Sequence, residues 1–379
     1  MILWIVYPFL IGGCAVLFQL DSRFDTSSSS PADQLSRFLN AAFAKIFPTD
    51  LSGFQLLLPF LYAWLALFMA IAVHELGHML AGWSARFRLT SMQLGPIQIT
   101  RSFQIKWRPG GRLPGAMGLV RMVPTDAGKL RMHAIIMLLG GPSANLLTAF
   151  LLVFLSPWHG LFATWFFLMS VFTGLFNLLP LRNKAVLSDG KRILMLLRNS
   201  RHGERWLALL RLNADIASGV DPEKLNPQFL AMAVAIEDES PDTVNAHVLA
   251  FASAYGKHDD PEAARLLEVC LRHSGRVWPA LREAAFLNAA IFQAERRKRA
   301  DLAEQWLADL PEKSLFPQNR LNAQGAILQS RGDIAGALKK LDESEAMVLH
   351  MAPSPKKEAA LRALQKWRAE LLEQTSSQA

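Results

Sequence analysis

Cysteine is scarce in this sequence of 379 residues, which contains only Cys14 and Cys270. Cys14 lies within an apolar N-terminal run and Cys270 lies in the polar second half of the chain. We therefore expect no disulfide, and nothing indicates an oxidising compartment for the second half. The N-terminus also lacks the basic stretch that opens a secretory signal peptide, so we interpret residues 1–20 as a retained apolar segment.

Charged side chains are absent from four long stretches, residues 1–20, 51–73, 134–156 and 161–181. A helix needs about 20 apolar residues to cross a hydrocarbon core about 30 Å thick, and each stretch has about this length. After residue 205 the sequence is typical of a soluble helical protein. We predict a mainly α-helical protein with two domains, a membrane-embedded domain of about four spans over residues 1–200 and a soluble domain over residues 205–379.

Acidic residues are rare in two connecting segments. Residues 84–133 hold nine Lys or Arg and one acid, whereas residues 182–205 hold seven Lys or Arg and two acids. Basic residues collect in the cytoplasmic loops of membrane proteins, so both segments and the soluble domain are predicted to be cytoplasmic, with residues 21–53 outside. The two segments together carry a charge of +13, whereas the whole chain carries +8, so the remainder of the chain carries −5. This distribution argues against nucleic-acid binding. We expect an integral protein of a bacterial inner membrane, in contact with the lipid bilayer.

A metal-binding pattern, His74-Glu75-Leu76-Gly77-His78, follows the second apolar stretch. Residues four apart share one face of a helix, so two imidazoles can hold one ion while Glu75 points towards its open side. In this zincin arrangement the carboxylate takes a proton from metal-bound water. The pattern also arises by chance, but ionisable residues at membrane depth are costly and indicate a functional site. We predict that His74 and His78 bind one Zn2+ and that Glu75 is the catalytic base.

Further polar segments are expected near the same side of the membrane. Gly140-Gly141-Pro142-Ser143-Ala144-Asn145 lies in the third apolar stretch, and Asn177-Leu178-Leu179-Pro180 closes the fourth, shortly before Ser188-Asp189-Gly190. Each has a structural explanation as well: a helix break, the bracing of a kink, or a turn. Their coincidence at one depth favours a site, because catalytic zinc needs a third protein ligand and a free position.

Together these segments resemble the site-2 protease family of intramembrane zinc metalloproteases. The family carries His-Glu-x-x-His, Gly-Pro-x-x-Asn and Asn-x-x-Pro followed by Asp-Gly, and the resemblance covers roughly residues 50–195. It implies that Asp189 is the third zinc ligand. Asp189 follows Asn177 by twelve residues instead of the family's eight, and Ser188 stands where the family has Leu. The insertion at residues 182–185 is expected to bulge at the membrane surface, and Asp126 is the alternative ligand.

The resemblance implies an enzyme that cuts peptide bonds in or near transmembrane segments of other membrane proteins. Asn145 and Asn177 are candidate catalytic residues that donate a hydrogen bond to the oxyanion, although each could instead brace a kinked helix. Alternating apolar and polar residues over 94–99 and 103–107 predict a small β-hairpin region. The resemblance implies that this membrane-associated sheet holds an extended substrate by strand addition, and a plain cytoplasmic hairpin is the alternative.

The second half contains no cluster of catalytic residues. Gly325, Leu328, Gly332-Asp333, Ala337 and Leu341 match the spacing of a tetratricopeptide repeat, and weaker copies include Asp260 and Asp301. We predict helical hairpins over residues 205–379 that bind a cytoplasmic protein partner. A helical domain with chance periodicity is the alternative.

Two rival functions are open. A membrane-anchored zinc protease with a cytosol-facing site and a Glu third ligand would need no Gly-Pro-x-x-Asn or Asn-x-x-Pro segment at membrane depth. A non-catalytic scaffold that recruits partners through its helical repeats would need no Glu75. Both segments and Glu75 are present, which favours the intramembrane protease.

Overall fold

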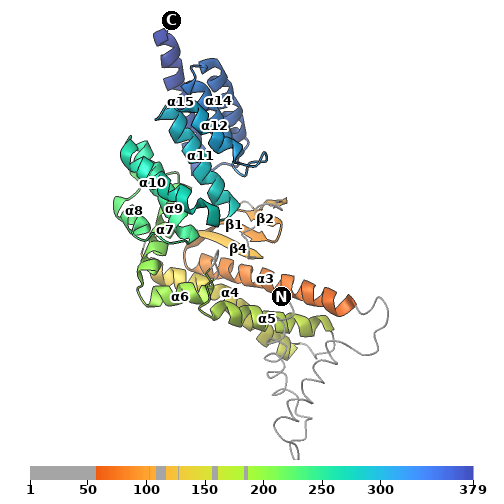
Figure 1. The fold of residues 1–379 in the computed structure, drawn as a ribbon. Helices are drawn as coiled ribbons and strands as arrows, with labels where there is room; N and C mark the ends of the chain where they lie inside the picture. The colour runs from red at the N-terminus through yellow and green to blue at the C-terminus, as the bar shows by residue number, and fades with distance from the viewer. Residues whose placement is uncertain are drawn as a thin grey trace, which may run out of the picture.

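The structure is a computed structural model that describes residues 57–101, 103–107, 117–126, 128–155, 161–182 and 187–378. Its backbone is mainly helical, with one small sheet (Figure 1). The predicted first span, residues 1–20, and the predicted external loop, residues 21–53, lie outside the described residues. The last three predicted spans lie within them, apart from a few terminal residues.

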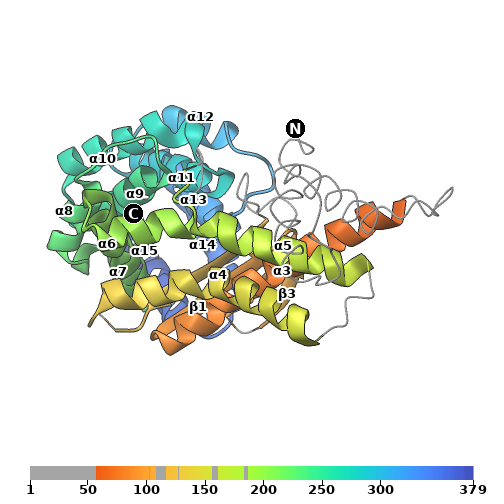
Figure 2. The same cartoon turned by 90° about the horizontal axis from the view of Figure 1, so that it is seen from below.

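Three apolar helices pack side by side, as both ribbon views show (Figures 1 and 2). They are α3 (Leu58–Ser84), α4 (Leu130–Leu155) and α5 (Leu161–Leu178). Each is long and apolar enough to cross a membrane, so the last three predicted spans correspond to helices that are candidate membrane spans by length and composition. Large apolar side chains such as Trp64, Leu80 and Leu147 are exposed on the bundle, as expected where lipid covers a helix.

The helix α3 extends beyond the predicted span and includes the metal-binding pattern, because no proline interrupts it between Pro59 and Ser84. It crosses α4 with the two backbones in contact. A Cβ atom added at Gly77 would lie only 2.9 Å from the carbonyl carbon of Gly140. A Cβ atom added at Gly140 would likewise lie 2.9 Å from the carbonyl carbon of Gly77. Small residues at this crossing therefore allow the Gly-Pro-x-x-Asn segment on α4 to lie against the histidines of α3.

A four-stranded antiparallel sheet follows α3 in the chain. Its strands are β1 (Phe87–Leu94), β2 (Ile97–Thr100), β3 (Ile105–Trp107) and β4 (Gly118–Pro124), in the spatial order β3-β2-β1-β4. The predicted hairpin corresponds to β2 and β3. The strands β1 and β4 were not predicted, because a β-bulge between Leu89 and Ser91 interrupts the alternation of β1 and because β4 has no alternation. Buried side chains of β1 and β4, including Phe87, Met92 and Met122, pack with Met79 of α3 and Leu138 of α4. The sheet is thereby fixed to the membrane helices.

Two helices connect the membrane helices to the remainder of the chain: α6 (Asp189–Leu197) and α7 (Arg201–Ala217). The helix α7 belongs to two apolar cores. Leu207 packs with the sheet, α3 and α4, whereas Leu209 and Leu212 pack in the core of the following helices. Arg205, 2% exposed, forms an ion pair with Asp238 at 3.2 Å and so links α7 to the segment before α9. The predicted domain boundary near residue 205 therefore falls within α7, a helix that belongs to both cores.

The remaining helices form successive antiparallel pairs. Their bounds are η2 (Pro222–Lys224), α8 (Pro227–Val234), α9 (Pro241–Gly256), α10 (Asp260–His273), η3 (Ser274–Arg276), α11 (Pro279–Glu295), α12 (Ala300–Ala308), α13 (Pro317–Ser330), α14 (Ile334–Leu349) and α15 (Pro355–Gln378). The hairpins α9–α10, α11–α12 and α13–α14 each pack closely. In each, a residue with positive φ lies two positions before the second helix: His258, Lys298 and Gly332. That these hairpins are tetratricopeptide repeats stays a prediction.

Candidate metal centre

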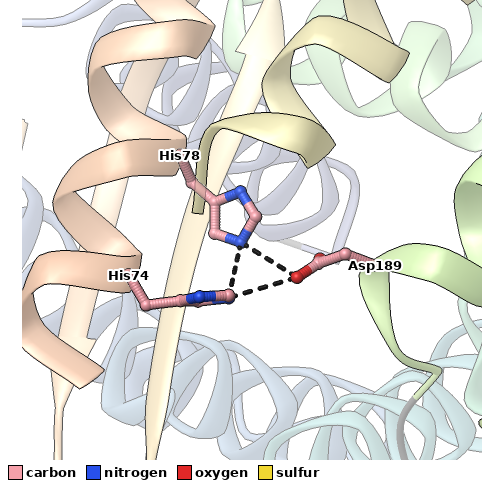
Figure 3. A group of neighbouring side chains, drawn as sticks. All are labelled: His74, His78 and Asp189. Carbon is pink, nitrogen blue, oxygen red and sulfur yellow. Dashed lines mark hydrogen bonds and ion pairs between the residues drawn. The ribbon is translucent and has the colours of Figure 1, made fainter. Parts of the chain in front are cut away.

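Three side chains converge between α3, α4 and the start of α6 (Figure 3). His74 and His78 lie one turn apart on α3, and their Nε2 atoms are 3.1 Å apart. Oδ2 of Asp189 lies 3.1 Å from Nε2 of His74 and 3.3 Å from Nε2 of His78. The three candidate ligand atoms thus form a small, nearly equilateral triangle.

The insertion before Asp189 leaves this geometry intact because the chain is paired across it. Arg182, the first residue of the insertion, forms an isolated bridge with Leu187, and residues 183–186 between them lie outside the described residues. Next to the bridge, the hydroxyl of Ser188 donates to the carbonyl of Leu179 at 2.5 Å and accepts from the N–H of Leu181 at 3.0 Å. The chain therefore returns to the end of α5 before Asp189, as a shorter connection would.

Ser188 also serves as the N-cap of α6, because its Oγ accepts a hydrogen bond from the N–H of Lys191 at 3.2 Å. Gly190 allows α6 to begin directly against the end of α5, since a Cβ there would lie within 3.0 Å of Cα of Leu178. The Asp-Gly pair consequently fixes where the Asp189 carboxylate enters the site. Burial alone would raise the pKa of this carboxyl, but His74 and His78 beside it hold the pKa well below its ordinary value. Asp189 is therefore ionised, as a metal ligand must be.

The triangle fits a zinc ion. Tetrahedral nitrogen and oxygen ligands at about 2.0–2.1 Å from zinc lie about 3.4 Å from one another, close to the 3.1–3.3 Å found here. Gly141 of α4 keeps the space beside the imidazoles open. A Cβ at this position would lie 2.5 Å from Nε2 of His78 and 2.8 Å from Nε2 of His74. Two histidines, a carboxylate and an adjacent gap are the donor set of a catalytic zinc site.

The Nδ1 atoms of both histidines face α4. Nδ1 of His78 lies 2.8 Å from the backbone carbonyl oxygen of Met137, which can only accept, and 3.3 Å from the backbone nitrogen of Gly141. The tautomer with the ring proton on Nδ1 donates to Met137 and leaves Nε2 free to bind a metal. Nδ1 of His74 lies 3.3 Å from the Nδ2 atom of Asn145, which is fully buried.

Glu75 is buried next to the triangle but is not one of its three members. Its side chain packs against the start of β4. A Cβ at Gly118, the first residue of that strand, would lie 2.7 Å from Cγ of Glu75. Gly118 therefore leaves room for the carboxylate between α3 and the sheet.

The other two predicted residues lie elsewhere. The carboxylate of Asp126 is exposed and forms an ion pair with Arg86 at 3.0 Å, so it does not belong to the triangle. The amide of Asn177 donates to the carbonyl of Thr173 in its own helix at 2.9 Å. The groups that sequence reasoning missed are the Met137 carbonyl and Gly118. Backbone groups leave no signal in a sequence, and Gly118 lies in a strand that lacks alternation.

Substitution of a ligand should remove the metal. We expect the parent protein to retain about one zinc ion per chain. His78→Ala and Asp189→Ala should each lose nearly all of this zinc, because the two remaining ligands are too few to hold the ion. Zinc content of the purified protein measures the effect. The matched control is Asp126→Ala, which should keep its zinc. Full retention in Asp189→Ala together with loss in Asp126→Ala would exchange the roles of the two carboxylates.

Comparison with known proteins agrees with this geometry. Residues 62–160 match the model of peptidase family M50, the site-2 protease family. The matched segment contains His74, Glu75, His78, Gly141 and Asn145, and it ends before Asp189. No curated protein and no solved structure matches the chain. The membrane half of this chain is thus similar to a family of membrane metalloproteases.

Proposed function

We propose that the protein is an intramembrane zinc metalloprotease that hydrolyses peptide bonds in or near transmembrane segments of other proteins, in regulated proteolysis. The observation that carries the proposal is the triangle of His74, His78 and Asp189 beside the buried carboxylate of Glu75. The three apolar helices around it support a site at membrane depth. The match to peptidase family M50 supports the reaction class.

The residues divide the chemistry between them. When bound, zinc supplies a Lewis acid that polarises the scissile carbonyl and makes water acidic enough to react near neutral pH. His74, His78 and Asp189 hold the ion. Glu75 takes the proton of the attacking water and passes it to the amine that leaves when the C–N bond breaks.

The position of β4 supports binding of the substrate as an extended strand. β4 forms one edge of the sheet, and within the described residues no strand pairs with its outer side. Since Gly118 at the start of β4 lies against the side chain of Glu75, this strand begins beside the proposed catalytic base. A membrane-spanning substrate must unwind before its backbone can be attacked, because its amides are hydrogen-bonded within its helix. Pairing with the edge of β4 would hold the unwound segment beside Glu75.

Two alternatives have less support. A cytosol-facing zinc protease with a Glu third ligand would place a second glutamate at the metal, but the described metal group contains Asp189 and no Glu. A non-catalytic scaffold would have no use for Glu75, whose burial against β4 carries a desolvation cost.

Removal of the base should stop cleavage without loss of metal. We expect Glu75→Gln to reduce cleavage of a model transmembrane helix by at least about 10²-fold, because general-base catalysis contributes about 10²–10⁴-fold. Its zinc content should equal that of the parent protein, whereas His78→Ala should lose both metal and activity. Cleavage by Glu75→Gln at near the parent rate would exclude Glu75 as the base.

The charge bias supports a protein of a bacterial inner membrane whose metal centre and soluble domain face the cytoplasm.

We expect single cysteines at residues 129 and 376 to react with an impermeant maleimide only after the membrane is permeabilised, and one at residue 30 to react in intact cells. Cys14 would be replaced by Ser. Cys270 can stay, because it is buried and burial raises the pKa of its thiol to about 12. Labelling of residue 376 in intact cells would overturn the orientation.

The helical hairpins of residues 205–379 are proposed to dock a cytoplasmic protein that controls access to the protease. The helices after Asp189 connect the hairpins to the candidate metal centre through direct contacts. Arg131 of α4 donates to the carbonyl of Leu196 at 2.7 Å and pairs with Glu204, while Arg205 is bound to Asp238. A partner that shifts the hairpins would therefore pull on α7 and α6, and α6 begins with Asp189.

The shared helix α7 determines where the soluble domain can be removed. A chain that ends after residue 220 keeps α7, so we expect it to bind zinc and to cleave a generic model helix while losing control over its natural substrate. A chain that ends at Arg205 loses Leu207 from the core with the sheet and should be less stable and bind less zinc. Zinc content and cleavage of the model helix measure both. Loss of zinc from a folded, inserted chain that ends after residue 220 would make the domain part of the catalytic structure.

A further inference from the structure

The side chain next to Nδ1 of His74, on the side of the ring away from the other two candidate ligands, is that of Asn145. A histidine that binds zinc through Nε2 carries its proton on Nδ1, and that proton needs an acceptor. His78 has one in the Met137 carbonyl. His74 faces the side-chain amide of Asn145 instead, with its Nδ1 3.3 Å from Nδ2.

The Asn145 amide can serve His74 in either protonation pattern. As the structure stands, Nδ2 donates to Nδ1 of His74, and the proton on Nε2 is directed to Oδ2 of Asp189 at 3.1 Å. This pattern suits the metal-free site. Within the described residues, Oδ1 of Asn145 is buried and has no hydrogen-bond partner. A half-turn of the amide would place Oδ1 beside Nδ1, where it accepts the proton that a zinc-bound His74 carries there.

The backbone of α4 explains why the amide reaches this ring and no other. Met137, Gly141 and Asn145 are four residues apart and share one face of α4, opposite His74 and His78 on α3. Met137 reaches His78 through its carbonyl, and Gly141 leaves the space between the two rings open. Asn145 then lies one turn further along, next to His74. One stripe of α4 thus supports both histidines.

We propose that Asn145 is a positioning residue that sets the tautomer of His74 and thereby raises the affinity of the site for zinc. The amide acts through His74 and does not touch the reacting atoms. This role differs from donation of a hydrogen bond to the oxyanion, which would require the amide to face the substrate. The inference rests on the metal site of the proposed function, but it concerns metal affinity and is independent of which substrate is cleaved.

The test compares two substitutions of similar size. Asn145→Leu removes the acceptor, and we expect the zinc affinity, measured by competition with a chromophoric chelator, to fall about 10- to 100-fold. Asn145→Asp keeps an acceptor oxygen and should retain most of the parent affinity. Co2+ substitution adds a spectroscopic readout: the visible absorption of the Asn145→Leu protein should shift or weaken, and that of Asn145→Asp should not.

Ser170→Ala is the matched control, because Ser170 is also fully buried in a membrane helix with no hydrogen-bond partner for its hydroxyl but is not part of the metal group. It should leave zinc affinity unchanged. Equal zinc affinity of the parent and a folded Asn145→Leu protein would overturn the proposal. Equal affinity combined with loss of cleavage in both Asn145 variants would assign Asn145 to the oxyanion. Absence of zinc binding by the parent protein would instead overturn the proposed function itself.

Discussion

The close crossing of α3 and α4 is the contact on which the metal centre depends. Lipid is as apolar as the helices themselves, so helices in a membrane associate through tight packing of small residues and through polar contacts. Gly77 and Gly140 allow the two backbones to touch. At this separation a backbone carbonyl of α4 can reach His78, and a short amide side chain can reach His74. A larger residue at either glycine would move both partners out of hydrogen-bonding range.

Satisfaction of polar groups is the second constraint. An unpaired polar atom in an apolar environment costs several kcal/mol, on the order of 2–7. Each ring nitrogen of His74 and His78 has a polar neighbour: Nε2 faces Asp189, and Nδ1 faces Met137 or Asn145. The site is therefore a nearly closed set of polar groups, which explains how so many can be buried between apolar helices.

The helix α7 makes the two halves of the chain mechanically continuous. Its first turns contribute Leu207 to the core that holds the sheet and α4, and the same helix contributes Leu212 to the core of the helical hairpins. Arg205 strengthens the connection, because a buried charge that lost Asp238 would be left uncompensated at a cost of about 3–5 kcal/mol. The helix α7 follows directly after α6, and the first residue of α6 is the candidate ligand Asp189.

The sequence by itself determined the apolar helices, the metal-binding pattern and the first two candidate ligands. Charge-free stretches of about 20 residues have few other uses, and the spacing of His74 and His78 places both on one face of any helix. The small sheet was only half predicted, because a β-bulge between Leu89 and Ser91 interrupts the alternation of β1 and because β4 has no alternation.

Only the tertiary structure decided between Asp189 and Asp126, since both follow the histidines at unremarkable distances in the sequence. Pairing of residues on either side of the insertion brings Asp189 to the imidazoles, whereas Asp126 is held at the surface by Arg86. The hydrogen-bond partners of the histidines could not be predicted from the sequence, for a different reason. One is a backbone carbonyl, which every residue possesses, and the other is an asparagine whose neighbours depend on how closely two helices cross. A sequence pattern records which side chains a site contains, but the distance between two helices follows from packing that no local pattern encodes.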